Sequence, residues 1–355
     1  IGEPDFAAPD KVLAAMKASL DAKETSYTGN SGMMELREAI SHHFEQRYGV
    51  HYDPKDEILV TVGVSEGLAM ALLAITEPGD EVIIPDPAYV AYPASVELAG
   101  GTPVFVPTYP EHDFKLTVEA LEKVITPKTK AIVIGYPNNP TGTVMSAEEL
   151  MPIAKFAEEH DLIVLSDEIY CELMYGDAKF TSFAKLPGMR ERTVIFNGFS
   201  KAYAMTGMRL GYVCAPREGL APILKLHQYA IMCANTTAQV GGITALKECD
   251  DDVEAMRQEY DRRRKVIYKG LCDMGLPVFE PKGAFYIFPD IRCTGMTSAE
   301  FCEKLVQEEK VAVVPGTAFG DQGEGFVRIS YAASMDTIQE ALKRMARFVA
   351  QYRKD

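Results

Sequence analysis

Short apolar runs alternate with helical stretches over most of the chain, and this alternation limits the folds that the chain can adopt. The runs are rich in valine and isoleucine and are typical of strands buried on both faces of a sheet. They lie at residues 57–63, 80–85, 101–107, 130–137, 162–168 and 193–200. Helical stretches at 65–75 and 147–160 separate some of them. Strands that alternate with helices indicate an α/β fold with a largely parallel, doubly wound sheet.

The last third of the chain has a different order of elements. A long charged stretch, residues 251–275, predicts a helix that connects two domains. It is followed by β-rich runs at 284–291, 311–316 and 325–332 and by helical stretches at 298–309 and 335–350. A chain of 355 residues is too long for one ordinary core. We therefore expect a large domain of residues 15–250 and a smaller α+β domain made of residues 1–14 and 251–355.

Composition excludes several classes of partner. A net charge of −15 argues against nucleic acid and against an anionic membrane surface. The longest apolar run, near residues 68–75, is far shorter than the ~18 residues of a membrane span. Seven cysteines without a C-x-x-C pair indicate free thiols in a reducing compartment, so we expect a cytoplasmic protein without a metal site.

Polar residues stand directly after several predicted strands. Gly63-Val64-Ser65 opens a helix, where free backbone N–H groups suit a phosphate, although an ordinary turn with a serine cap is an alternative. Asn139 lies in a turn rich in proline. Asp167 ends an apolar run; a carboxylate there is partly buried and needs a partner, or it caps a helix. The chain has no G-x-G-x-x-G and no G-x-x-x-x-G-K-[ST], which disfavours dinucleotide and nucleoside-triphosphate binding.

A lone lysine lies in the stretch NGFSKAYAMTGMRLGY, residues 197–212. Lys201 is surrounded by small and apolar residues, so its amine can be desolvated and used, and Arg209 follows eight positions later. Ligands of open α/β sheets bind beyond the carboxyl ends of the strands, which brings these residues together. A lysine for a Schiff base, a carboxylate for a pyridine nitrogen and an arginine for a phosphate suit pyridoxal phosphate.

Five short motifs follow one another along the chain. They are Gly2-Glu3-Pro4-Asp5-Phe6, Asn139-Pro140-Thr141-Gly142, Ser166-Asp167-Glu168-Ile169-Tyr170, Gly198-Phe199-Ser200-Lys201 with Gly207 and Arg209-Leu210-Gly211, and Phe326-Val327-Arg328-Ile329-Ser330. In type and order they resemble the motifs of class I pyridoxal-phosphate aminotransferases of fold type I, over essentially the whole chain. The match is closest to the bacterial branch of aspartate, aromatic and N-acetyl-diaminopimelate aminotransferases, and residues 332–336 resemble the last group.

The resemblance implies pyridoxal 5'-phosphate as cofactor and a role for each residue around its ring. Lys201 is then the Schiff-base lysine and the base that transfers the proton. Asp167 pairs with the pyridine nitrogen, and Tyr170 and Asn139 hydrogen-bond the ring hydroxyl oxygen. Tyr89 stacks on the ring. These roles make Lys201, Asp167 and Tyr170 the catalytic set.

The resemblance also implies a phosphate site made of Val64, Ser65 and Arg209. Tyr27 resembles a tyrosine that is lent to the phosphate site of a neighbouring subunit, so the active unit is expected to be a homodimer with shared sites. Two positions depart from the family pattern. Gly198 stands where the family often has a serine that binds phosphate. Ser65 stands where some aspartate-specific relatives place a lysine, which argues against strict aspartate specificity.

For the substrate, the resemblance implies that Arg328 binds the α-carboxylate, helped by Asn139 and the backbone of Gly2. The alternative for Arg328 is a surface arginine on an edge strand. The expected reaction moves the amino group of an L-amino acid to a 2-oxo acid by a ping-pong mechanism, with an aspartate, aromatic or diaminopimelate-type donor. Two alternatives stay open, a β-elimination lyase on the same fold and an aminotransferase-like sensor domain of a transcription regulator.

Overall fold

A seven-stranded sheet forms the centre of the larger part of the molecule. The computed structural model describes residues 2–354, and its main sheet has the order β1-β7-β6-β5-β4-β2-β3. The strands are β1 (Ile58–Thr61), β2 (Glu81–Asp86), β3 (Thr102–Pro107), β4 (Thr129–Ile134), β5 (Ile163–Asp167), β6 (Thr193–Gly198) and β7 (Gly211–Cys214). Strands β2 to β6 pair in parallel, whereas β7 runs antiparallel to both β1 and β6.

Helices cover both faces of this sheet, because consecutive strand residues point to opposite sides. In β4, Val133 packs with the helices of one face and Ile134 with those of the other. The first face carries α3 (Gly63–Ile75), α4 (Ala91–Leu98) and α7 (Arg217–Ala230). The second carries α2 (Met34–Tyr48), α5 (Val118–Leu121), α6 (Ala147–Glu159) and α8 (Thr236–Glu248), with α1 (Asp10–Asp21) packed on α8. This arrangement confirms the predicted α/β doubly wound fold.

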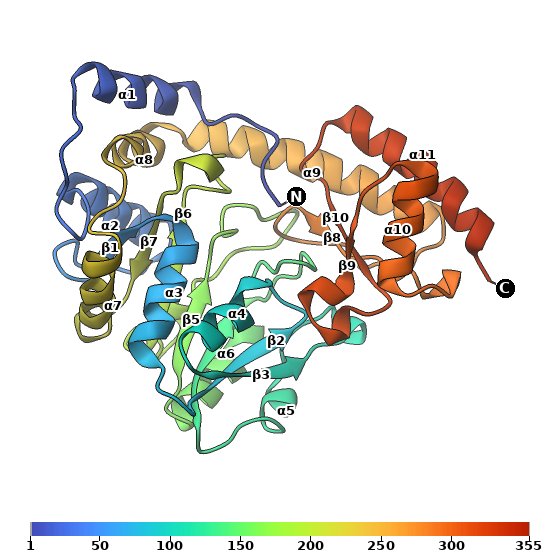
Figure 1. Cartoon of the computed structure of the whole chain (residues 1–355), viewed down its shortest axis with the longest axis horizontal. Helices are drawn as coiled ribbons and strands as arrows, with labels where there is room; N and C mark the ends of the chain where they lie inside the picture. The colour runs from blue at the N-terminus through green and yellow to red at the C-terminus, as the bar shows by residue number, and fades with distance from the viewer. Residues whose placement is uncertain (1, 355) are drawn as a thin grey trace.

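A smaller sheet lies beside the large one. It consists of β8 (Tyr286–Ile287), β10 (Val327–Ser330) and β9 (Val314–Pro315), in that order and antiparallel. Figure 1 shows α9 (Asp250–Asp273) running from α8 to this sheet. Helices α10 (Ser298–Glu309) and α11 (Met335–Tyr352) belong to the same part of the molecule as the small sheet. The helix predicted over 251–275 and the predicted mixed α and β content of the region after it are therefore present.

Differences from the predicted elements have local causes. The sequence does not predict strand β7, because its four residues, Gly211–Cys214, overlap the end of the lysine stretch and begin with a glycine. It does not predict helix α2 either, because this helix buries polar Arg37 and Ser41 beside its apolar residues, which blurs its periodicity. Within residues 2–354, no helix has both the length and the apolar composition that a membrane crossing requires.

Candidate active site

A cavity of about 560 Å³ lies at the carboxyl ends of the parallel strands and is lined by residues of both sheets. The main sheet contributes residues that follow β2, β4, β5 and β6, and the small sheet contributes residues of β8, β9 and β10. The predicted site residues that line it are Gly2, Val64, Ser65, Tyr89, Asn139, Asp167, Tyr170, Lys201, Arg209 and Arg328. Residues far apart in the sequence thus meet where ligands of open α/β sheets bind.

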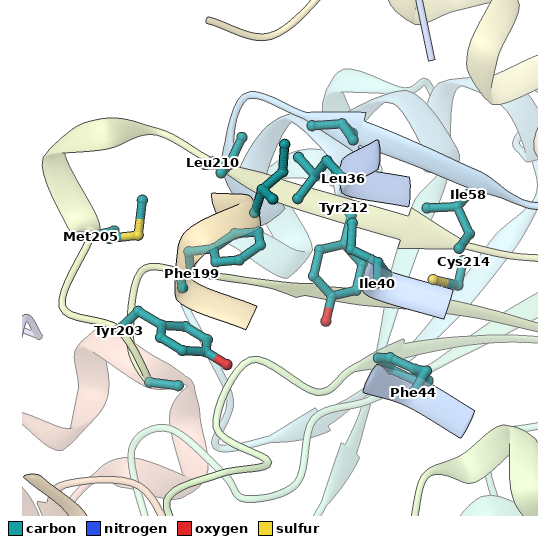
Figure 2. Close-up of a cluster of buried hydrophobic side chains, with 14 of the residues drawn as sticks. Leu36, Ile40, Phe44, Ile58, Phe199, Tyr203, Met205, Leu210, Tyr212 and Cys214 are labelled. Carbon is teal, nitrogen blue, oxygen red and sulfur yellow. The ribbon is translucent and has the colours of Figure 1, made fainter. Parts of the chain in front are cut away.

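The loop that carries Lys201 is held by apolar side chains on either side of the lysine. Phe199, Tyr203, Met205 and Leu210 are buried in one cluster with residues of α2 and β7 (Figure 2). The N–H of Phe199 also donates to the carbonyl of Leu210 at 3.2 Å. Because the flanking residues are fixed in the core, Lys201 is presented to the cavity from a rigid base.

Lys201 lies in surroundings that weaken its hold on a proton. Its Nζ donates to the backbone carbonyl of Gly2 at 2.6 Å. The pKa of the amine is lowered to about 8, mainly by burial; the charges of Asp167 and Glu3 oppose this shift, and two cavity arginines add to it. An amine with such a pKa is partly neutral near neutral pH, which is the form that acts as nucleophile and base.

Asp167 is a buried carboxylate at the end of β5. Its Oδ2 accepts the hydroxyl of Tyr92 at 2.8 Å, and its Oδ1 accepts the N–H of Ile169 at 3.2 Å. Burial raises the pKa of Asp167, while these hydrogen bonds and the charge of Lys201 lower it. No helix begins at this position in the described chain, so the alternative of a helix cap is wrong. The carboxylate is available for a cationic ring nitrogen.

The start of α3 and Arg209 form a concave anion site. Gly63 has a φ of +74°, and a Cβ there would lie 2.6 Å from Nη2 of Arg209, so the guanidinium sits directly on the helix start. The N-cap residue is Val62 and no side chain caps the helix, so the alternative of a serine cap at Ser65 is wrong. Free N–H groups at a helix start beside a guanidinium suit a phosphate.

The position of Gly198 follows from the packing behind this anion site. A Cβ on Gly198 would lie 2.8 Å from the Cα of Gly211, so a serine does not fit without a shift of β7. Gly211 in turn touches the start of α3, since its own Cβ would lie 2.7 Å from the backbone nitrogen of Val64. The departure from the family pattern at Gly198 is thus coupled to close contact between β6, β7 and α3.

Arg328 lies in β10, the middle strand of the small sheet, and is buried. Its Nη1 donates to Oδ1 of Asn139 at 3.0 Å, and its Cζ lies 4.5 Å and 4.7 Å from the ring centroids of Tyr286 and Phe319. Within residues 2–354 it has no carboxylate partner, and its Nε has no hydrogen-bond partner. The alternative of a surface arginine on an edge strand is therefore wrong. A buried guanidinium without an anion is suited to bind one.

Tyr27 does not line the cavity of its own chain. Its side chain is 80% exposed. Two hydrogen bonds hold the surrounding segment: the hydroxyl of Thr236 donates to the carbonyl of Ser26 at 2.8 Å, and the side-chain amide of Asn30 donates to the carbonyl of Met232 at 3.0 Å. The tyrosine is thus an exposed side chain on an anchored segment. Its predicted role requires a second subunit.

Comparison with known proteins identifies the family. The sequence profile described as "Aminotransferase class I and II" matches residues 1–345. The chain belongs to this family. An aspartate aminotransferase of Pyrococcus abyssi is 49% identical, over 99% of this chain and 91% of the relative. A protein of Bacillus subtilis named probable N-acetyl-LL-diaminopimelate aminotransferase is 44% identical, over 99% and 89% of the two chains.

A solved structure agrees with this assignment. The aromatic aminotransferase of Pyrococcus horikoshii OT3 superimposes with a TM-score of 0.97 at 49% identity, over 99% of this chain and 95% of that one. The chain is therefore a class I aminotransferase of fold type I, an enzyme whose family uses pyridoxal 5'-phosphate.

The cavity of this aminotransferase fits pyridoxal phosphate. An anion site at α3, a buried carboxylate at β5 and a lysine with a lowered pKa surround one space of about 560 Å³. Tyr170 is buried, and its hydroxyl lies 2.8 Å from that of Tyr286. These groups match the phosphate, the ring nitrogen, the aldehyde and the ring hydroxyl of the cofactor.

Three site residues were not predicted from the sequence. Tyr92 bonds Asp167, Tyr286 bonds Tyr170, and the rings of Tyr286 and Phe319 both pack against the guanidinium of Arg328. Tyr92 stands three residues after Tyr89, and this helical spacing is the one signal that links it to the pocket. No sequence signal links Phe319 to Arg328.

Proposed function

We propose that this aminotransferase moves the amino group of an L-amino acid to a 2-oxo acid by a ping-pong mechanism, with Arg328 as the receptor of the substrate α-carboxylate. The observation that carries this proposal is the buried guanidinium of Arg328, which bonds Asn139 and has no carboxylate partner in the described chain. Its planar fork matches a carboxylate, and it lines the same cavity as Lys201, so a substrate bound to it lies in the cavity that holds the amine.

The proposed roles of the chain's residues follow from their positions. Bound pyridoxal phosphate supplies an electron sink for the negative charge that develops at the substrate Cα. Lys201 Nζ moves the proton at this carbon. Asp167 holds a proton on the ring nitrogen by its charge, and Tyr92 keeps the carboxylate in place. Burial raises the pKa of Tyr170, so its hydroxyl stays protonated and can donate to the ring oxygen.

The lining of the cavity favours an aromatic or other apolar donor. Its cations in the described chain are Lys201, Arg209 and Arg328, and each already has a proposed partner. Ser65 adds no charge, and the small-sheet side contributes Phe319 beside Val314 and Ala318. A second carboxylate of the donor therefore finds no free cation in this chain, whereas an aromatic ring meets apolar surface.

A panel of donors tests this proposal. Phenylalanine, tyrosine, aspartate and diaminopimelate are mixed singly with the cofactor-loaded enzyme, and the change of its visible spectrum gives the rate of each half-reaction. The fastest change is expected with the aromatic donors, and 2-oxoglutarate is expected to reverse it. If a donor instead yields pyruvate and ammonia when no 2-oxo acid has been added as acceptor, the enzyme is the β-elimination lyase.

We also propose a homodimer with shared active sites. Tyr27, Tyr229, Ile231 and Met232 are 80%, 79%, 40% and 45% exposed, and Asn30, three residues after Tyr27, donates to the backbone of Met232, which joins the two exposed apolar segments. Such a surface is typical of an interface between subunits.

The free thiols support our proposal that the protein acts in the cytoplasm, where cysteines stay reduced. The division into residues 15–250 and residues 1–14 with 251–355 stays a prediction.

A further inference from the structure

One loop contacts both the main sheet and the proposed carboxylate receptor. Residues 316–323 form two consecutive 3₁₀ turns beside the small sheet. The ring centroid of Phe319 lies 4.7 Å from Cζ of Arg328. On its other side the loop meets the segment after β2, where the N–H of Ala88 donates to the carbonyl of Phe319 at 2.9 Å. A displacement of this loop would therefore disturb the packing of Arg328.

Asp86, the last residue of β2, holds this loop. It is buried, and the N–H of Gln322 lies 3.3 Å from its Oδ1 and 3.4 Å from its Oδ2. Gly320 has a φ of +130°, and a Cβ there would overlap Oδ1 of Asp86, so this approach requires glycine. Thr108 fixes the carbonyl of Asp86 with its N–H at 2.8 Å and its hydroxyl at 2.9 Å. The backbone of Asp86 is thus fixed, and its carboxylate holds the loop to the end of β2 beside the backbone bond between Ala88 and Phe319.

The strength of this contact depends on charge. Burial raises the pKa of Asp86 to about 6, the N–H of Gln322 opposes this, and the charge of Asp321 adds to it. Asp321 is the charged group that faces Asp86 from the loop, and Thr108 on the β3 side is neutral. Hydrogen bonds to an ionised acceptor are about twice as strong as neutral ones. The contact therefore weakens as the pH falls through about 6.

We propose that Asp86 is a positioning residue for substrate binding. Its carboxylate holds residues 316–323 in place and, through Phe319, fixes the guanidinium of Arg328 for the substrate α-carboxylate. This inference rests on the proposed function, since it takes Arg328 as the carboxylate receptor. The proposed cofactor contacts of Asp167 are not on this loop, so the visible spectrum of the resting enzyme should not depend on Asp86.

Two variants disturb the contact from opposite sides, Asp86→Asn on the strand and Gly320→Ala on the loop. Asp321→Asn is the matched control, because it removes a neighbouring charge and leaves the Asp86 carboxylate in place. The probes are maleate and 3-phenylpropionate, whose binding to the cofactor-loaded protein is measured by calorimetry. We expect both disturbing variants to bind both probes about tenfold more weakly, as for loss of a hydrogen bond to a charged group. The control stays within about twofold.

Two further readouts separate positioning from general structural damage. KM for amino acids and 2-oxo acids should rise with the dissociation constants, while kcat changes less. The affinity of the parent for 3-phenylpropionate, whose own carboxyl group stays ionised near pH 6, should fall as the pH is lowered through about 6, and Asp86→Asn should lack this dependence. A purely structural role would lower thermal stability without removing this pH dependence.

The inference is overturned if both disturbing variants bind the probes like the parent, or if their main effect is on the visible spectrum of the resting enzyme. It is also overturned if the parent binds neither probe, because Arg328 is then not a carboxylate receptor. If no donor reacts but the variants still lose affinity for the probes, the proposed reaction fails and the role of Asp86 stands.

Discussion

Lys201 Nζ is buried near two arginines, and its pKa of about 8 means that the charged amine destabilises the folded chain at neutral pH. The unfolded chain keeps the ordinary value of 10.5, so it binds more protons than the folded chain between about pH 8 and 10.5. The destabilisation is thus complete below about pH 8 and disappears as the pH rises through this window.

We predict that Lys201→Met stabilises the cofactor-free protein by about 3 kcal/mol at neutral pH, at about 1.4 kcal/mol per pKa unit. The difference between variant and parent should shrink steadily between about pH 8 and 10.5. Urea unfolding of both proteins across this range measures it, and the parent corrects for all other titrating groups. A difference that stays constant with pH would contradict the lowered pKa.

Among the elements, the junction of β6, β7 and α3 decides the shape of the phosphate site. The backbone of Gly211 lies against that of Gly198 on one strand and that of Gly63 at the helix start, and a Cβ on Gly211 would lie 2.7 Å from the nitrogen of Val64. The start of α3 can therefore face the cavity only because β7 approaches it without a side chain. Gly207 lies in the same lysine stretch but is not closely packed: a Cβ there would meet no other atom of the described chain within 4 Å.

We predict that Gly211→Ala weakens binding of pyridoxal phosphate at least about tenfold, since overpacking of this kind costs about 1–3 kcal/mol and moves the N–H groups that bind the phosphate. Gly207→Ala is the matched control and should bind the cofactor within about twofold of the parent. Spectral titration of the cofactor-free proteins measures both dissociation constants. Equal affinities of the two variants would show that the junction does not shape the site.

At the scale of the whole molecule, the active site is shared between two sheets and, in our proposal, between two subunits. In a dimer with shared sites, Lys201 of one chain works with Tyr27 of the other. Lys201→Ala and Tyr27→Ala variants are each expected to have low activity. Mixed dimers should regain one intact site, formed by the lysine of the second variant and the tyrosine of the first.

Subunit exchange between these two variants tests the arrangement. Tagged and untagged chains are unfolded, mixed and refolded, and the mixed dimer is purified by its single tag. Its activity should approach about half that of the parent dimer refolded in the same way, because one of its two sites carries no substitution. Activity no higher than that of the two variants would place Tyr27 outside the partner's site.

The sequence predicted the parts of the molecule whose signal is local. Six strands of the main sheet and the residues at their ends were found from apolar runs and turn residues, and Lys201 stood out by its apolar neighbours. Contacts between distant segments were not predictable. Tyr92 meets Asp167 only because α4, which packs on β2 and β3, places its side chain at the end of β5, and Phe319 meets Arg328 only because a loop folds back beside β10.

The most direct test of the central claim, that Arg328 receives the substrate α-carboxylate, is the half-reaction rate of Arg328→Lys with a series of donors. Lysine keeps the charge but not the planar fork. We predict a loss of about 30-fold or more for phenylalanine, aspartate and diaminopimelate alike, from about 2 kcal/mol or more for a buried ion pair, with an unchanged spectrum of the resting enzyme. A loss confined to aspartate would contradict the claim, because Arg328 would then bind the donor's side chain.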